Sequence, residues 1–315
     1  MSRTQAYSTI TSGAGRELSS SLFPILGNDV LQTWAERIRK VGVQNIWLTA
    51  ASRDGKETSP ALGQLVRQGI ERLLMIKLKS YAEMDLSDLV RFHCERRNSI
   101  TEVLDSRGRL GISVFDQFAL AKDLAKDKKS TGIPRTGQCT QYPFAGYAKR
   151  ILSAKERQEL VRDALTGVCA MRPAGEQIGD HVWLGEDVSV DTSAKIVGPS
   201  YIGDRTSVRA GATVGPFSSV ERDCIVDCGS AVEHSTVLPS TYLGVGLMFR
   251  HAMVDGSQLQ DLDSGVIADL EPAGLARRIA PRQSKRQTST RNEIFSPDCN
   301  AWLGAQYATV QQVQP

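Results

Sequence analysis

A repeat of six residues in the second half of the chain is the feature that most constrains its fold. A branched aliphatic residue returns at every sixth position without a miss, at Ile178, Leu184, Val190, Ile196, Ile202, Val208, Val214, Val220, Val226 and Val232. With about one chance in four of Ile, Leu or Val at a position, such a run would arise about once in a million trials. A period of six fits neither the period of about 3.6 in a helix nor the period of two in a strand. The pattern therefore predicts a coil made of three short strands.

Three such hexads close one coil, so residues of successive coils should stack on one another. We expect Ile178, Ile196, Val214 and Val232 to lie along one edge of the interior, each buried between its neighbours. Glycine follows the aliphatic residue at four places, where it fits a sharp corner with unusual backbone angles. The pattern resembles the left-handed parallel β-helix of hexapeptide-repeat proteins, and the handedness is implied by that resemblance. After Val232 the register slips, and we expect looser terminal coils or a cap.

The first half of the chain alternates between helix and strand patterns. We expect helices at Asp29–Val41, Leu62–Leu73, Asp85–Arg97 and Ala154–Leu165, strands at Asn45–Ala50 and Leu74–Leu78, a hairpin at Ser99–Asp116 and a loop at Asp127–Gln141. This alternation predicts an α/β domain with a mostly parallel sheet. The expected organisation is an α/β domain over residues 1–150, a helical linker over 151–177, the β-helix over 178–275 and a flexible basic tail over 276–315.

Bulk properties narrow the functional classes. The net charge of +3 is too small to argue for a nucleic-acid partner, and the 315 residues contain no apolar run of membrane-spanning length. The six cysteines form no CxxC pair, which gives no sign of a bound metal and favours free thiols. We therefore expect a cytoplasmic protein.

Three segments resemble the sugar-nucleotide pyrophosphorylases, the NDP-sugar synthases that include mannose-1-phosphate guanylyltransferases. They are LFPILGNDVLQTWAERIRKVGVQNIWL near the N-terminus, MDLSDLVRFHCERRNSITEVL in the middle of the first half, and AKIVGPSYIGDRTSVRAGATVGPFSSV in the repeat. The resemblance covers most of residues 6 to 270. It implies a Rossmann-like nucleotidyltransferase domain followed by a left-handed β-helix.

The motifs that carry this family's chemistry are altered here. The resemblance implies a glycine-rich phosphate loop, which keeps Gly13 and Gly15 but has Glu17 where the family has an arginine. Ser20-Ser21 occupy the place of a lysine-proline pair, and Lys79 stands where an aspartate would hold Mg²⁺. We expect nucleotidyl transfer to be lost or weak, with no catalytic residue identifiable and with Mg²⁺ as cofactor only if activity remains.

Three functions stay open. The first is a pyrophosphorylase-like protein of sugar-nucleotide or polysaccharide metabolism with a binding, regulatory or scaffold role, which binds a nucleotide sugar or sugar phosphate. The second is a working pyrophosphorylase. The third is a hexapeptide-repeat acyltransferase with a histidine as general base, for which His181, His234 and His251 are the candidates. We also expect a homo-oligomer, with Val214 and Phe217 near the contact.

Overall fold

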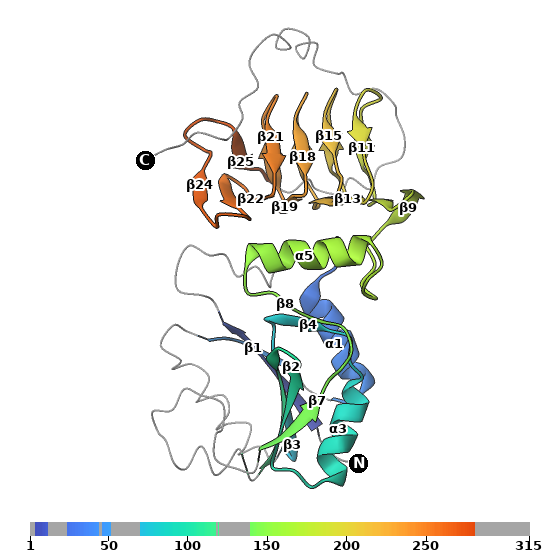
Figure 1. The fold of residues 1–315 in the computed structure, drawn as a ribbon, viewed down its shortest axis with the longest axis vertical. Coiled ribbons are helices and arrows are strands. Elements are labelled where there is room, and N and C mark those ends of the chain that lie inside the picture. Colours follow the sequence, from blue (N-terminus) through green and yellow to red (C-terminus); the bar gives the residue numbers. More distant parts are fainter. Residues whose placement is uncertain are drawn as a thin grey trace. The chain divides into compact units, whose positions relative to one another are not determined.

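The computed structural model describes residues 4–11, 24–43, 46–51, 70–117, 119 and 139–280. The chain divides into two compact units, the first formed by Met1–Leu22 and Asp29–Glu156, the second by Phe23–Asn28 and Arg157–Pro315. The first unit is an α/β domain and the second is a parallel β-helix (Figure 1). The predicted fold class, an α/β region followed by a parallel β-helix, is confirmed, and its geometry is consistent with a left-handed β-helix.

A six-stranded mixed sheet forms the core of the first unit. Its strand order is β2 (Ile46–Ala51), β1 (Thr4–Thr11), β3 (Arg72–Lys77), β6 (Gly108–Asp116), β5 (Ile100–Asp105) and β7 (Cys139–Pro143). Strand β1 runs parallel to β2 and β3, whereas β6 runs antiparallel to both β3 and β5. A second small sheet pairs β4 (Ser80–Ala82) with β8 (Ala148–Arg150). Within the six-stranded sheet only β6 runs against the other five strands, so the sheet is mostly parallel, as the alternation predicted.

The helices of this unit begin and end close to their predicted limits. Helix α1 (Val30–Lys40) buries Val30, Trp34 and Ile38, the apolar stripe expected for a helix that packs on a sheet. Helix α3 (Leu86–Glu95) begins after Asp85, whose carboxylate accepts a hydrogen bond from the Ser87 N–H at 2.8 Å.

Two of the expected boundaries are wrong. The predicted helix Leu62–Leu73 lies partly outside the described residues, but its end at Arg72 and Leu73 forms the start of β3. The predicted loop Asp127–Gln141 ends in strand, because β7 begins at Cys139 and pairs with β5. Both errors are boundary errors, in which pairing with a neighbouring strand overrides the local pattern.

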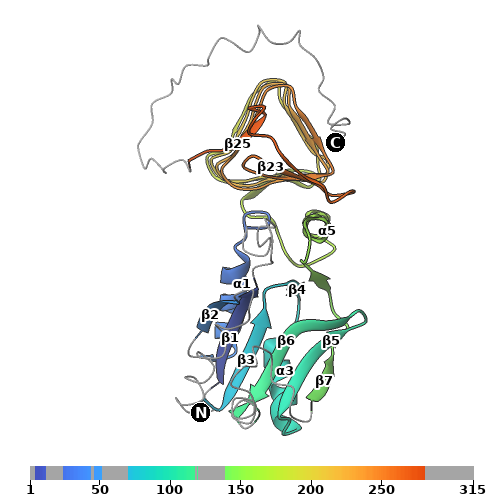
Figure 2. The same ribbon diagram turned by 90° about the vertical axis from the view of Figure 1, so that its left-hand side faces the viewer.

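Short strands of the second unit form three sheets that close into a coil. The strands are β10 (Val182–Leu184), β11 (Ser189–Val190), β12 (Lys195–Ile196), β13 (Ser200–Ile202), β14 (Ser207–Val208), β15 (Thr213–Val214), β16 (Ser218–Val220), β17 (Ile225–Val226), β18 (Ala231–Glu233), β19 (Thr236–Val237), β20 (Thr241–Leu243), β21 (Met248–Arg250) and β22 (Ala252–Asp255). Parallel partners such as Val190 and Val208 are 18 residues apart. Seen along its axis, the coil has a triangular outline (Figure 2).

The interior of the β-helix is filled by the repeated aliphatic residues. Ile202 pairs with Leu184 on one side and with Val220 on the other, and none of its surface is exposed. Val214 is equally buried between Ile196 and Val232. Val214 lies inside the coil, so its own side chain is not exposed to another copy, and the homo-oligomer stays a prediction.

The first member of the repeat does not belong to the interior. Ile178 lies in β9 (Glu176–Gly179), which runs antiparallel to β10, and its exposed fraction is 57%. It therefore does not stack under Ile196, contrary to the prediction. Val190, in the first coil, is 36% exposed.

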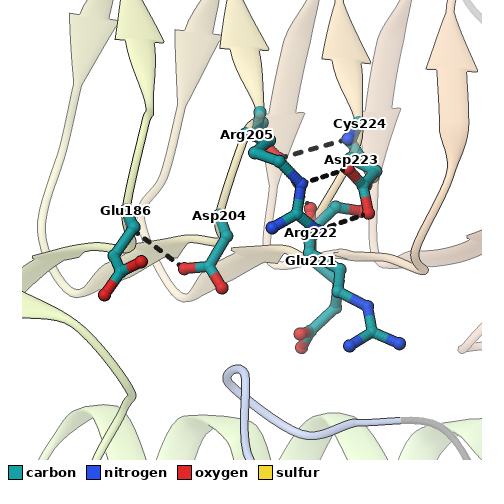
Figure 3. Close-up of polar contacts among 8 residues, drawn as sticks. Glu186, Asp204, Arg205, Glu221, Arg222, Asp223 and Cys224 are labelled. Atoms are coloured by element: carbon teal, nitrogen blue, oxygen red, sulfur yellow. Dashed lines mark hydrogen bonds and ion pairs between the residues drawn. The ribbon is translucent and has the colours of Figure 1, made fainter. Parts of the chain in front are cut away.

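Corner residues of successive coils also stack. Asp187, Arg205 and Asp223 all have positive φ, between 53° and 59°. Arg205 binds the Asp223 carboxylate with two hydrogen bonds of 2.7 and 2.8 Å, and the Asp204 carboxylate accepts the Glu186 N–H at 2.9 Å (Figure 3). Polar side chains thus connect neighbouring coils at this corner.

Beyond Val232 each coil is one residue shorter. Val220, Val226 and Val232 pair with Val237, Leu243 and Phe249, which are 17 residues further on. The end of the coil is then covered by β23 (Gln258–Asp261) and β24 (Ile267–Asp269), which continue antiparallel from β22, and by β25 (Ala276–Arg278), antiparallel to β20. The sequence predicted the slip and a cap, but not the additional regular coil.

A tight turn at 24–28 is bound to the β-helix through Glu221. This buried carboxylate accepts the N–H groups of Leu26 and Gly27 at 2.8 and 3.0 Å. Arg157, in the part of helix α5 (Ala154–Leu165) that belongs to the second unit, is fully buried and donates to the Pro24 carbonyl. Burial raises the pKa of Glu221, and the Arg157 charge opposes that shift. Gly27 has φ +76°, and a Cβ there would lie 2.2 Å from the Tyr201 hydroxyl, so the turn requires glycine.

Two further observations concern the described residues alone. None of their helices combines the length and apolar content needed to cross a membrane. Cys94, Cys139, Cys169 and Cys224 are free thiols, whereas Cys228 is disulfide-bonded, which differs from the free thiol expected there.

Candidate functional site

A pocket of about 210 Å³ opens in the first unit at the carboxyl end of β3. Its charged lining residues are Lys77, Lys79, Glu102, Arg109 and Arg150. The remaining lining is Ser80, Val103, Leu110, Gly111, Ile112, Ser113 and Leu152. In open α/β sheets, ligands bind beyond the carboxyl ends of parallel strands, and β3 is parallel to β1. The pocket therefore lies where such a fold places a ligand.

The two lysines are positioned by the end of β3 and the turn that follows it. Lys77 is the last residue of β3, and the Lys79 N–H donates a hydrogen bond of 2.7 Å to the Lys77 carbonyl. The Lys79 carbonyl in turn accepts the Ile151 N–H at 2.7 Å. Both the N–H and the carbonyl of Lys79 are thus hydrogen-bonded. These bonds fix the position of its Cα beside the pocket.

Gly111 in β6 makes room for the side chain of Lys77. Its φ is +76°, and a Cβ built at this position would lie 3.1 Å from the Lys77 Cβ. A glycine inside a strand commonly marks such a close approach. Any larger residue here would displace the Lys77 stem.

The two arginines of the pocket have carboxylate partners. Arg109 Nε lies 3.0 Å from Glu102 Oε2. Arg150 binds Asp105 with hydrogen bonds of 3.0 and 2.8 Å, and these lower the pKa of the Asp105 carboxyl. Both arginine charges are therefore balanced within the unit.

Lys77 and Lys79 have no carboxylate within ion-pair distance among the described residues. Four cations of the pocket, Lys77, Lys79, Arg109 and Arg150, face two carboxylates, Glu102 and Asp105, which leaves an excess of two positive charges. Burial lowers the pKa of Lys77, and the neighbouring charge of Lys79 lowers it further. The pocket thus offers two positive charges to an anion.

The sequence pointed to one part of this site. Lys79 lies at the pocket, whereas Gly13, Gly15 and Glu17 lie outside the described residues. Lys77, Arg109 and Gly111 were missed. One signal was available: lysine ends a strand whose preceding residues, Leu73–Ile76, are all apolar.

The histidines of the β-helix form a different arrangement. The His234 ring stacks between Phe217, at 5.2 Å, and His251, at 5.1 Å, and the Arg162 guanidinium lies over Phe217 at 4.7 Å. The Nδ1 atom of His181 lies 2.9 Å from the Leu165 carbonyl oxygen. Burial, followed by the charges of His251 and Arg162, lowers the pKa of His234. Ring stacking accounts for His234 and His251 without a catalytic role.

Over the described residues, His, Cys, Asp and Glu side chains form no group of three or more that could hold a metal ion.

Comparisons with known proteins give no family for the chain. No family model and no curated protein matches it. Among solved structures it is similar to a putative glucose-1-phosphate thymidylyltransferase from Bacillus anthracis in complex with a sucrose. The identity is 12%, the TM-score is 0.43, and the match covers 51% of this chain and 96% of that one. This likeness is too distant to support a function, so the functional argument depends on the pocket.

Proposed function

We propose that this chain is a nucleotidyltransferase-like protein of sugar-nucleotide or polysaccharide metabolism that has lost nucleotidyl transfer and retains a binding, regulatory or scaffold role. The observation that carries the proposal is Lys79 at the pocket beside β3. The resemblance of the sequence to pyrophosphorylases places the Mg²⁺-binding aspartate at this position.

The residues of the pocket do not fit Mg²⁺. This ion requires oxygen ligands, usually one or two carboxylates, and an ammonium group repels it. Glu102 and Asp105 are already paired with Arg109 and Arg150, whose positive charges oppose a bound cation. The excess of positive charge therefore disfavours binding of Mg²⁺. Without Mg²⁺, the ion that would neutralise a reacting triphosphate is missing.

The expected loss of rate is large. One missing charged contact to a reacting phosphate costs on the order of 3 kcal/mol in the transition state, about a hundredfold. The sequence adds Glu17 and Ser20-Ser21, which replace two cationic positions of the family pattern. Even without additivity, little transfer should remain.

Pyrophosphate release tests this proposal. The protein is incubated with each nucleoside triphosphate, Mg²⁺ and a panel of hexose 1-phosphates, and we expect no pyrophosphate above background. Turnover of about one per second with any pair of nucleoside triphosphate and hexose 1-phosphate would overturn the proposal. If that turnover also disappeared in Lys79→Ala, the site would be an active one that uses the lysine directly.

A further inference from the structure

The first coil of the β-helix has a coil on one side only, so its interior residues stay partly uncovered. Leu184, Val190 and Ile196 continue the column of repeated aliphatic residues, but Val190 is 36% exposed and the other two are only partly buried. In the next coil, Ile202 and Val208 are at most 2% exposed. Apolar interior therefore reaches the surface at the end of the β-helix formed by Leu184, Val190 and Ile196, which we call the open end.

The strands at the open end also lack a partner on one side. β11 and β12 are the edge strands of their sheets. In the second coil, the Val208 carbonyl accepts the Asp191 N–H of the first coil at 2.9 Å. Val190 holds the same place one coil earlier, where no strand among the described residues supplies a donor. Unpaired edges of this kind accept another segment of chain.

The rim of the open end is acidic. With histidine neutral, residues 180–197 carry four carboxylates and one cation, a net charge of −3: Asp180, Glu186, Asp187, Asp191 and Lys195. Glu186 and Asp187 make no ion pair within the described part of the chain, and Arg205 of the next coil is held by Asp223 (Figure 3). The open end of a second copy would bring like charges together, which disfavours it as the occupant.

The C-terminal segment of the chain has a complementary composition. Residues 282–295 carry four cations and one carboxylate, a net charge of +3: Arg282, Lys285, Arg286, Arg291 and Glu293. The segment ends in two apolar residues, Ile294 and Phe295, and contains no proline. It therefore offers cations for the rim, apolar side chains for the uncovered interior and an N–H group at every residue for the strand edges.

The described part of the chain also ends at the corner of the β-helix that leads to this rim. The Ile279 N–H donates a hydrogen bond of 2.8 Å to the Ser240 carbonyl. Ser240, Asp223, Arg205 and Asp187 all have positive φ and occupy this corner in successive coils, so Asp187 lies three coils from Ser240. At about 4.8 Å per coil the separation is about 14 Å, which about five extended residues span. The segment is long enough to reach the open end.

We infer that residues 282–295 dock on the open end of their own β-helix and close it. The cations lie against the acidic rim, and Ile294 and Phe295 cover the uncovered interior at Val190. The docked segment shields two strand edges that would otherwise be free to pair with other chains. This role belongs to the β-helix and does not depend on what the first unit binds.

Hydrogen exchange of the full chain, measured by mass spectrometry, tests the docking. The amides of residues 282–295 should exchange at least about tenfold more slowly than those of a synthetic peptide of the same sequence. Glu186→Lys should speed this exchange roughly twofold to fivefold, because it reverses one charge of the rim. The matched control is Glu271→Lys, the same change at an exposed carboxylate between β24 and β25, where the other end of the coil is covered. It should leave the exchange unchanged.

The apolar contact is tested by the double variant Ile294→Ser and Phe295→Ser. It changes no described residue of the β-helix, so the coil should stay folded while the slow exchange of the segment is lost. Exchange of residues 282–295 at the rate of the free peptide in the unchanged chain would overturn the inference, and so would equal exchange in the unchanged chain and both sets of variants.

Zero-length carbodiimide cross-linking identifies the contact and its source. In an equal mixture of isotope-labelled and unlabelled full-length chains, we expect Lys285 to be linked to a carboxylate of residues 180–191 within one copy. Lys285→Arg should remove that link. Links that join only labelled to unlabelled chains would overturn docking within the chain and assign the open end to the segment of another copy.

Discussion

His93 is a buried titratable residue of the first unit that has no part in the pocket. Only 2% of its surface is exposed, and its Nδ1 lies 2.8 Å from the Thr101 hydroxyl oxygen. Burial lowers its pKa to about 4, with the Asp116 charge opposing and the Arg72 charge adding to the shift. The folded protein therefore favours the neutral imidazole.

This shift predicts acid sensitivity of the first unit. A histidine whose pKa is lower folded than unfolded stabilises the fold above the unfolded pKa of about 6.5, and that stability is lost as the pH falls toward about 4. The loss should be about 3 kcal/mol. Hydrogen exchange at the Thr101 and Val114 amides, followed from pH 7 to pH 4, measures it. His93→Gln should flatten this pH dependence; an unchanged slope in the variant would assign the acid sensitivity to other groups.

Among the residues of the pocket, the sequence could locate only one that stands at a fixed spacing from a recognisable motif. Lys79 could be found because it stands six residues before Asp85, the cap of a helix with a clear pattern. Arg109 and Gly111 are brought to Lys77 by the register between β3 and β6. That register depends on tertiary packing and not on local preference. The pocket therefore could not be predicted from any single segment of the sequence.

At the scale of elements, the repeat specified most of the β-helix. The six-residue period gave the coil, the partners of Ile202 and the slip after Val232. The error at Ile178 has a physical cause. The period marks apolar positions, but burial needs a coil on each side, and β9 runs antiparallel to β10 instead of forming one.

The contrast between two isoleucines tests this account. Ile202→Ala should lower the free energy of unfolding by roughly 2–5 kcal/mol, because it removes buried methylene groups and leaves a cavity. Ile178→Ala makes the same chemical change at a residue that is 57% exposed and should cost less than about 0.5–1 kcal/mol. Urea melts measure both. Asp204→Ala would be a poorer control, because the Asp204 carboxylate accepts the Glu186 N–H. Equal losses at the two isoleucines would show that this register is wrong.

For the whole molecule, the sequence predicted the two classes of fold but not the arrangement of the first sheet. The hairpin predicted at Ser99–Asp116 was confirmed as β5 and β6, with Asp105 and Gly108 as the last pair before the turn. The parallel pairing of β7 with β5 joins Cys139 to Ile100 across a long stretch of chain. Such distant pairings follow from the packing of the complete domain and carry no local pattern.

Self-association stays a prediction, with the position of the contact revised. Val214 is buried, but Met248 in β21 is 37% exposed, and Val197, the residue after β12 of the same sheet, is 41% exposed. We expect a homo-oligomer by light scattering at micromolar concentration. Met248→Glu should shift it toward the monomer, because a charge at an apolar contact is costly to bury. A monomer in the unchanged protein would contradict the prediction, and an unshifted oligomer in Met248→Glu would place the contact elsewhere.

The turn at 24–28 has a consequence for the order of events during synthesis. Its Leu26 N–H depends on Glu221, which is added 195 residues later. At about 5–20 residues per second, the ribosome takes roughly 10–40 seconds to cover that distance. During this time the turn has been made but lacks the carboxylate that it requires, while Asp29–Glu156 emerge in between. The second unit therefore includes a segment, Phe23–Asn28, that is synthesised before helix α1 of the first unit. A nascent chain stopped before Glu221 cannot bind this segment through that carboxylate.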